Sequence, residues 1–143
     1  KGWNQPMIDQ GTDSSIVGLI KKDDLYLVEA KFEPGNYGKL LFSPTLQVTY
    51  DNLNKLHDGR KPLFSNHFND KKNIKFSHWY PEDGGRFYKK RTKYILVEVN
   101  DIESIPDSFI WLTIDQIKEL LKRDNLVSSH LRSIVATIFA YGE

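Results

Sequence analysis

Apolar and polar residues alternate along the first part of the chain, which is the pattern of half-buried β-strands. Residues 16–20 are apolar and rich in β-branched side chains, and the charged stretch 21–24 interrupts them. Alternation resumes over residues 25–32, so the two segments predict a β-hairpin. Residues 40–48 predict a third strand that breaks or bends near Pro44, because proline cannot donate a ladder hydrogen bond.

Two further strands are predicted in the middle of the chain, after a long polar connection over residues 51–73. A connection of that length is uncommon in a compact domain unless it is functional or contains a short helix. Residues 74–80 then alternate, with Ile74 and Phe76 facing inward. Residues 94–99 give the clearest strand pattern, since their aliphatic side chains at alternate positions share one face.

Two amphipathic helices close the sequence. Thr113 and Gln116 fit a capping box, in which the threonine caps the helix and the glutamine reaches back to the free backbone N–H. Apolar residues follow at helical spacing, and residues 124–125 end this helix. Ser128 or Ser129 caps a second helix, which has an apolar stripe of its own.

The chain length fits one α+β domain, residues 1–143, in which the helices pack on a strongly bent, mostly antiparallel sheet. The chain has no cysteine, which excludes a disulfide framework, a thiolate nucleophile and a cysteine-based zinc site. Its net charge of +1 gives no electrostatic reason to expect a nucleic-acid partner. No apolar stretch approaches the roughly 20 residues of a membrane span, so we expect no membrane partner and a cytoplasmic location.

Uncharged hydrogen-bonding side chains gather after Pro34 and Gly35, where a type II turn is expected. They are Asn36, Ser43, Thr45, Gln47, Thr49 and Asn52. Such a cluster suits a ligand with many hydroxyl and carbonyl groups, such as a sugar. A solvated turn followed by a polar strand face accounts for the same residues, since serine, threonine and asparagine are ordinary there.

A charged turn at residues 82–86 offers a different chemistry. Arg86 could hold a phosphate bidentately, and Glu82 could act as a general base; a solvated hairpin turn is the alternative. The four histidines show neither a helical i, i+4 pair nor an HExxH motif, so a metal site is poorly supported. His57 and His67 lie in the long polar connection, where either could do acid–base work.

Trp79 stands at the end of a predicted strand beside the charged turn, which makes it the best candidate for stacking on a base or a sugar. The basic stretch 89–93 follows an aromatic pair and could touch RNA or a diphosphate. With the overall charge balanced, we favour an exposed strand edge that lysines protect from pairing with other chains. No GxGxxG, GxxxxGK[ST] or GxSxG motif occurs, so neither a glycine-rich phosphate loop nor a serine hydrolase is supported.

A series of short motifs runs in a fixed order through the chain. The motifs are EPGN at 33–36, LFSPTLQVT at 41–49, HDG at 57–59, PEDGGRF at 81–87, and the ending over 112–133. In this order they resemble the EPGN…LSPTVQAT…HGG, SEEGGRF and WxT…DNVVN…TRS motifs of the NDP-hexose 2,3-dehydratases. The resemblance runs from about Trp3 to the last helix.

The resemblance implies a Nudix-like α+β fold with a bent mixed or antiparallel sheet, and a dTDP-linked 4-keto-6-deoxy sugar as the ligand. The family eliminates water across C2 and C3 of that sugar in deoxysugar biosynthesis. The C4 ketone acidifies the C3 proton, the enolate needs hydrogen-bond donors near O4, and an acid helps the C2 hydroxyl to leave. We therefore expect a lyase that needs neither a cofactor nor a metal.

Carried over position by position, and together with Trp79, the resemblance gives a set of site residues. Those expected to bind the ligand are Asn36, Ser43, Thr45, Gln47, Thr49, Asn52, Trp79, Arg86 and Arg132. Glu82 and His57 are the candidates for proton transfer. Arg86 would face the diphosphate or the sugar, and Arg132 would close the site or make a dimer contact.

Departures from the family pattern leave other functions open. Family members usually carry two such modules, so we expect either a tandem with a second module or a homodimer. The changes at Pro81, Ser128 and His130 are compatible with another sugar, or with a module that binds without catalysis. A non-catalytic nucleotide-sugar-binding or dimerisation module of the same fold is therefore the second hypothesis. The clustered glutamates of the Nudix signature are absent, and we predict no diphosphate hydrolysis. A third hypothesis, RNA binding by residues 86–94, predicts steeply salt-dependent affinity.

Overall fold

The hairpin expected at the start of the chain is present in the computed structural model, which describes residues 14–33, 39–49, 63–81, 91–123 and 126–141. Strands β1 (Ser14–Lys22) and β2 (Leu25–Glu33) pair antiparallel, and Lys22 is the partner of Leu25. Asp23 in the turn has a φ of 56°, a left-handed conformation that aspartate tolerates better than most residues.

The two hairpin strands stay paired over only three residue pairs and then separate, which bends the sheet. β3 (Lys39–Ser43) continues along β2, whereas β4 (Leu46–Thr49) crosses over to β1. Thr45 lies at this fork, where its hydroxyl accepts the Ile20 N–H at 3.0 Å and donates to the Leu27 carbonyl. The predicted break in the third strand is confirmed, and a buried hydroxyl bridges the strands where they part.

β6 (Arg91–Glu98) is an internal strand, parallel to β1 and antiparallel to β5 (Ile74–Pro81), in a sheet of order β3-β2-β1-β6-β5. The sheet is therefore mixed, and both strands predicted for this part of the chain are confirmed. The strand-edge interpretation of the basic stretch is wrong for Lys93, because β6 is hydrogen-bonded on both sides; residues 89–90 lie outside the described residues. A parallel partner distant in sequence leaves no local signal, so the pattern cannot separate an edge from an interior strand.

β7 (Phe109–Thr113) is a strand that the sequence pattern does not predict. It pairs with β2 on the edge away from β1 and leads directly into α3 (Ile114–Leu121). An apolar residue in this strand is not necessarily buried, since Ile110 is 45% exposed. Trp111 is partly buried against the cluster described next.

Two short 3₁₀ helices, η4 (Ser65–Phe68) and η5 (Lys71–Asn73), occupy the described part of the long connection before β5. Phe68 packs so closely on Gly18 of β1 that a Cβ there would lie 2.4 Å from its ring. A hydrophobic cluster fills this face of the sheet, and the residues predicted to share one face of β6 belong to it. Its buried members are Ile16, Ile20, Leu27, Leu46, Phe64, Phe68, Ile95, Val97 and Val99.

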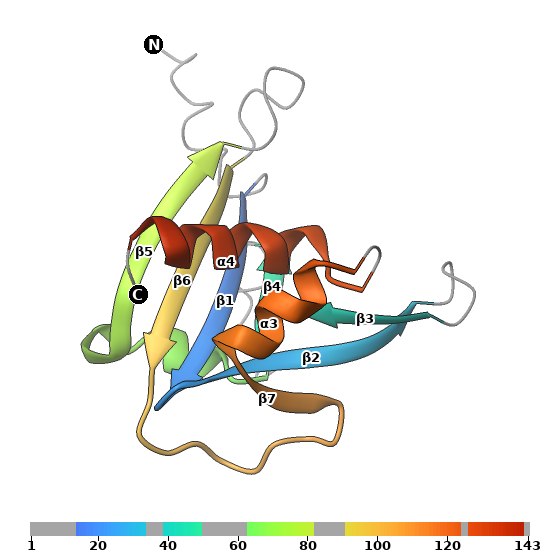
Figure 1. Cartoon of the computed structure of the whole chain (residues 1–143). Helices are drawn as coiled ribbons and strands as arrows, with labels where there is room; N and C mark the ends of the chain where they lie inside the picture. Colours follow the sequence, from blue (N-terminus) through green and yellow to red (C-terminus); the bar gives the residue numbers. More distant parts are fainter. Residues whose placement is uncertain (1–13, 34–38, 50–62, 82–90, 124–125, 142–143) are drawn as a thin grey trace.

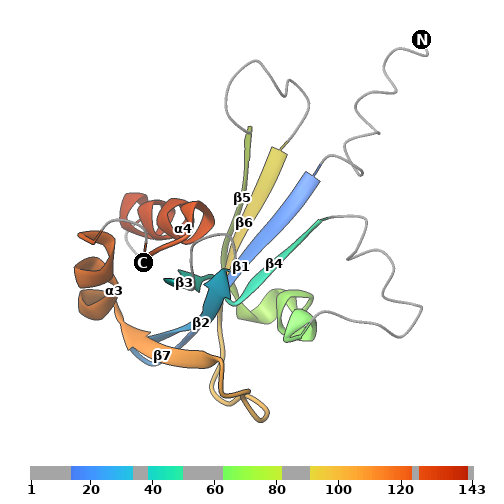
Figure 2. The same ribbon diagram turned by 90° about the vertical axis from the view of Figure 1, so that its right-hand side faces the viewer.

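The helices α3 and α4 (Ser129–Ala140) cover the opposite face of the sheet (Figures 1 and 2). The capping box is confirmed: the Thr113 hydroxyl accepts the Gln116 N–H at 3.1 Å, and the Gln116 amide oxygen accepts the Thr113 N–H at 2.8 Å. Ser128 caps α4 by accepting the Leu131 N–H at 3.1 Å. No helix in the described ranges has the length and apolar character that crossing a bilayer requires.

A second hydrophobic cluster lies between these helices and the sheet. Its fully buried members include Val17 and Leu19 of β1, Leu96 of β6, and the predicted apolar stripe of α4. That stripe consists of Leu131, Ile134, Val135 and Ile138, each 0% exposed. Because both faces of the sheet are covered at this level, β1 and β6 are apolar on both sides rather than strictly alternating.

Candidate functional site

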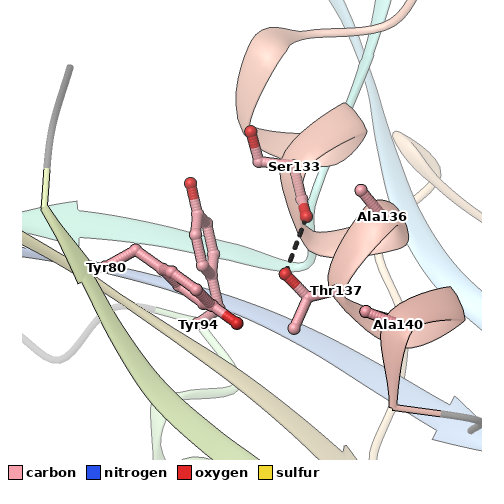
Figure 3. Close-up of a pocket in the computed structure, with 6 residues that line it drawn as sticks. All are labelled: Tyr80, Tyr94, Ser133, Ala136, Thr137 and Ala140. Carbon is pink, nitrogen blue, oxygen red and sulfur yellow. Dashed lines mark hydrogen bonds between the residues drawn. The ribbon is translucent and has the colours of Figure 1, made fainter. Parts of the chain in front are cut away.

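A pocket of about 360 Å³ opens between α4 and the strands β5 and β6. Its lining residues are Tyr80, Tyr94, Ser133, Ala136, Thr137 and Ala140 (Figure 3). The helix residues stand at i, i+3, i+4 and i+7, so they form one stripe beside the large apolar stripe that anchors α4. Their side chains are small, and the space that larger residues would fill is left open above the two tyrosine rings.

The pocket has an aromatic floor and hydroxyl groups on its helical side. The Tyr80 and Tyr94 rings meet across β5 and β6 with centroids 5.5 Å apart. On the helix, the Thr137 hydroxyl donates to the Ser133 carbonyl at 2.9 Å, as Figure 3 shows. Because that bond uses the Thr137 proton, its oxygen remains available as an acceptor. Phenols and hydroxyls around a partly apolar cavity suit the hydroxyl and keto groups of a sugar.

Tyr80 is connected to a second aromatic pair at the end of α4. Its hydroxyl donates to the Tyr141 hydroxyl at 3.4 Å, and the Tyr141 ring stacks on His78 with centroids 4.3 Å apart. The hydrogen bond to Tyr141, followed by partial burial, raises the pKa of the Tyr80 phenol above its usual value, against a smaller opposing effect of Thr137. Tyr80 therefore stays protonated at physiological pH and serves as a hydrogen-bond donor rather than as a base.

The sheet brings two of the predicted ligand residues into register with this pocket. Gln47 is the partner of Val17, Val17 is the partner of Tyr94, and Tyr94 is the partner of His78. Residues paired in this way point to the same face of a sheet, so Gln47 shares the face of the pocket tyrosines.

The neighbouring cross-strand row contains the second of these residues. It runs Thr49, Ser15, Thr92, Tyr80, one residue from each of the strands β4, β1, β6 and β5. Thr92 is buried at 1% exposure. Ser15 and Thr92 therefore follow one another by register across the sheet towards Tyr80, and Thr49 is paired with Ser15 through its backbone.

Ser43 and Thr45 do not line the pocket. Both are buried, at 3% and 5% exposure, and lie at the fork between β3 and β4. The Thr45 hydroxyl makes the two backbone hydrogen bonds described above. Their expected contact with a ligand stays a prediction, and the bonds of Thr45 give that residue a structural role.

Trp79 and Arg132 lie away from the pocket lining. Trp79 is next to Tyr80 in β5 and therefore points to the opposite face of the sheet. Arg132 is exposed on α4, and its Nη1 donates to the Leu121 carbonyl at 3.3 Å, which connects α4 to the end of α3. The remaining predicted site residues lie outside the described residues: Asn36, Asn52, His57, Glu82 and Arg86.

The pocket residues themselves are not among the candidates that the sequence provides. Tyr80 and Tyr94 sit within predicted strands, where aromatic residues are ordinary. A signal was present in the helix, because Ser133, Ala136, Thr137 and Ala140 keep small side chains at helical spacing. That stripe becomes informative only once the sheet partner is known. In the described ranges, no group of three or more histidine, aspartate or glutamate side chains could hold a metal ion.

Two solved structures show what kind of fold positions this pocket. An ADP compounds hydrolase matches with a TM-score of 0.55 at 10% identity, over 90% of this chain and 71% of that one. A bifunctional NMN adenylyltransferase/ADP ribose pyrophosphatase from Francisella tularensis matches with a TM-score of 0.52 at 12% identity, over 98% of this chain and 47% of that one. The Nudix-like α+β fold is confirmed, and identities this low carry no function.

Comparison of the sequence identifies the family, within that fold class, to which the chain belongs. The model of the NDP-hexose 2,3-dehydratase family matches residues 1–138, and the chain belongs to this family. Two relatives carry the name dTDP-4-dehydro-6-deoxy-alpha-D-glucopyranose 2,3-dehydratase. The one from Saccharopolyspora spinosa is 33% identical over 141 residues, and the one from Amycolatopsis orientalis is 32% identical over 142 residues. Each alignment covers 95% of this chain but only 29% or 30% of the relative, so the chain spans about three-tenths of their length.

Proposed function

We propose that this chain is a module of a dTDP-4-keto-6-deoxyhexose 2,3-dehydratase, a hydro-lyase of deoxysugar biosynthesis. The observation that carries the proposal is the family match over residues 1–138. The pocket under α4 supports it, because about 360 Å³ lies within the ordinary size range of small-molecule sites. A tandem arrangement with a second module or a homodimer, and a cytoplasmic location, belong to the same proposal.

In the proposed reaction, the sugar lies over the two tyrosine rings. Removing the C3 proton leaves negative charge on O4, and a protonated phenol aimed at that oxygen stabilises the enolate. Tyr80 can act as this donor when its single proton turns from the Tyr141 hydroxyl to O4, and its raised pKa keeps that proton in place. Glu82 and His57 remain the candidates for removing the C3 proton and for assisting the C2 hydroxyl to leave. Glu82 follows Tyr80 by two positions in the sequence.

Exchange of the C3 hydrogen tests the chemistry directly. The purified protein is incubated in D₂O with dTDP-4-keto-6-deoxyglucose, and deuterium at C3 and loss of water are followed by mass spectrometry. Tyr80→Phe is expected to slow the reaction by about 10²–10³-fold, the usual cost of losing one oxyanion donor. Tyr26→Phe, which removes a phenol outside the pocket, is the matched control and is expected to leave the rate unchanged.

The alternative is a module that binds the nucleotide sugar without catalysing elimination. It is favoured by the length of the relatives, since most of each relative lies outside the aligned region. Binding of the sugar nucleotide with no exchange at C3 would support this alternative. Exchange that is equally fast in Tyr80→Phe and in the unaltered protein would refute the role of the pocket.

A further inference from the structure

The face of the sheet opposite the pocket carries a different chemistry. Trp79 in β5 is the partner of Lys93 in β6, and both alternate with the pocket tyrosines next to them in sequence, so they share the other face. Arg91 lies two residues before Lys93 and therefore on this face as well. The Trp79 side chain is 38% exposed although tryptophan is the largest apolar residue.

The two cations lie against the tryptophan ring. The Arg91 guanidinium carbon is 4.4 Å from the ring centroid, and the Lys93 Nζ is 5.5 Å from it. Both distances are within the range of cation–π contacts. Such a contact holds a cation in place, but it neither neutralises the charge nor supplies an acceptor for its N–H groups.

No carboxylate compensates these charges in the part of the chain that the structure describes. The ion pairs there involve Lys31, His67, Lys75 and Lys122, and neither Arg91 nor Lys93 is among them. The Arg91 Nε is also buried and has no hydrogen-bond partner among the described residues. A buried donor without an acceptor is uncommon in a folded protein. Here it belongs to one of two neighbouring cations that no described carboxylate compensates, which is the arrangement expected of an anion site.

Neighbouring residues give this site an apolar boundary. Lys93 is the partner of Ile16 in β1, and Ile16 is the partner of Val48 in β4. Ile16 belongs to the cluster under η4, and Val48 packs against that cluster. The site therefore combines a half-exposed aromatic ring, an apolar flank and two positive charges. A bare anion needs only the charges, whereas a nucleoside diphosphate uses all three features.

We propose that Trp79, Arg91 and Lys93 form a binding site for a nucleoside diphosphate, with the phosphates on the two cations and the nucleoside against the tryptophan. β5 ends the described path of the sheet, and Trp79 and Tyr80 stand on its two faces. The diphosphate thus has two sources: the substrate itself, reaching around β5 from the pocket, or a separate free nucleotide. The first source rests on the proposed function, whereas binding of thymidine diphosphate can be tested without elimination chemistry.

Isothermal titration calorimetry with thymidine diphosphate, thymidine and inorganic pyrophosphate tests the site. The double variant Arg91→Gln, Lys93→Gln is expected to weaken thymidine diphosphate binding tenfold or more, with most of the salt dependence lost. Trp79→Leu is expected to weaken thymidine diphosphate more than pyrophosphate, and Arg91→Lys to recover part of the affinity. Lys118→Gln is the matched control, since Lys118 lies 5.2 Å from the Phe139 ring on the helical side, and it is expected to bind normally.

The proposal would be overturned if the double variant bound thymidine diphosphate with an affinity within twofold of that of the unaltered protein. It would also be overturned if the protein bound RNA and had no affinity for thymidine diphosphate. Circular dichroism shows whether each variant is folded. If Trp79→Leu does not fold, the double variant still tests the site. If KM for C3 exchange rises tenfold in the double variant while kcat is unchanged, the ligand is the substrate's own diphosphate. Normal KM together with lost thymidine diphosphate binding identifies a separate nucleotide.

Discussion

Thr45→Val should destabilise the fold strongly even though valine has nearly the shape of threonine. The substitution removes the hydroxyl that accepts the Ile20 N–H at 3.0 Å and donates to the Leu27 carbonyl. Thr45 is 5% exposed, so water cannot readily replace these partners. Each buried polar group left unpaired costs about 1–3 kcal/mol, and the carbonyl retains a second lone pair, so we expect a total of about 2–4 kcal/mol.

Thermal unfolding followed by circular dichroism measures this loss. For a domain of this size we expect the melting temperature to fall by about 6–15 °C. Thr45→Ser is the matched control, because it keeps the hydroxyl and loses one methyl group, at a cost of about 1 kcal/mol. Guanidinium unfolding of the same variants should give the same order, with an unchanged dependence on denaturant.

Two results would refute the reasoning: Thr45→Val as stable as the unaltered protein, or Thr45→Ser as unstable as Thr45→Val. The same variants separate the structural role of Thr45 from the ligand contact predicted for it. A ligand contact would appear as lost affinity for the sugar nucleotide at unchanged stability. Loss of stability with a normal affinity of the folded protein for the sugar nucleotide would show that Thr45 serves only to hold the strands together at the fork between β3 and β4.

Three further predictions concern packing and protonation. Gly18→Ala should cost about 1–3 kcal/mol of stability in thermal unfolding, because its Cβ would lie 2.4 Å from the Phe68 ring; Phe68→Leu in the same chain should recover part of the loss. Tyr141→Phe should lower the pKa of Tyr80 towards its usual value, measured by NMR titration of the phenol carbon, since it removes the hydrogen bond that stabilises the protonated form. The hydrogen bond with His67 lowers the pKa of Glu103 below 4.5. The ionised Glu103 therefore stabilises the fold above that pH, and this stabilisation is lost as the pH falls through the folded pKa. Acid unfolding of the unaltered protein and of Glu103→Gln should show the difference.

The local signals in the sequence predicted local structure well. The capping box of Thr113 and Gln116, the Ser128 cap and the first hairpin are each encoded within a few residues, so their physics can be read from neighbouring side chains. The parallel pairing of β1 with β6 and the addition of β7 to β2 depend on contacts between distant segments. No local propensity encodes such partners, which is why an internal strand at Lys93 was indistinguishable from an edge.

The residues of the candidate site also fall into two groups, those that a local pattern indicates and those that depend on contacts between distant segments. Gln47 could be chosen from its chemistry, and the register of the sheet places it on the face of the pocket. Tyr80 and Tyr94 could not be singled out, because a tyrosine in a strand acquires a special role only when a small helical side chain stands opposite it. The pocket is a product of how β5, β6 and α4 meet, and a pattern along one segment does not contain that information.

The division of the pocket between a tyrosine floor and a helical roof has a consequence for how such a module can change over generations. Ala136 and Ala140 contribute little to the anchoring of α4, which depends on the apolar stripe beside them. Exchanging these alanines for larger or more polar residues would reshape the cavity while leaving the sheet, the helix anchor and the tyrosines as they are. In the proposed dehydratase, preference among related sugars can therefore drift through single substitutions on one helix face, with the tyrosines at the floor held constant.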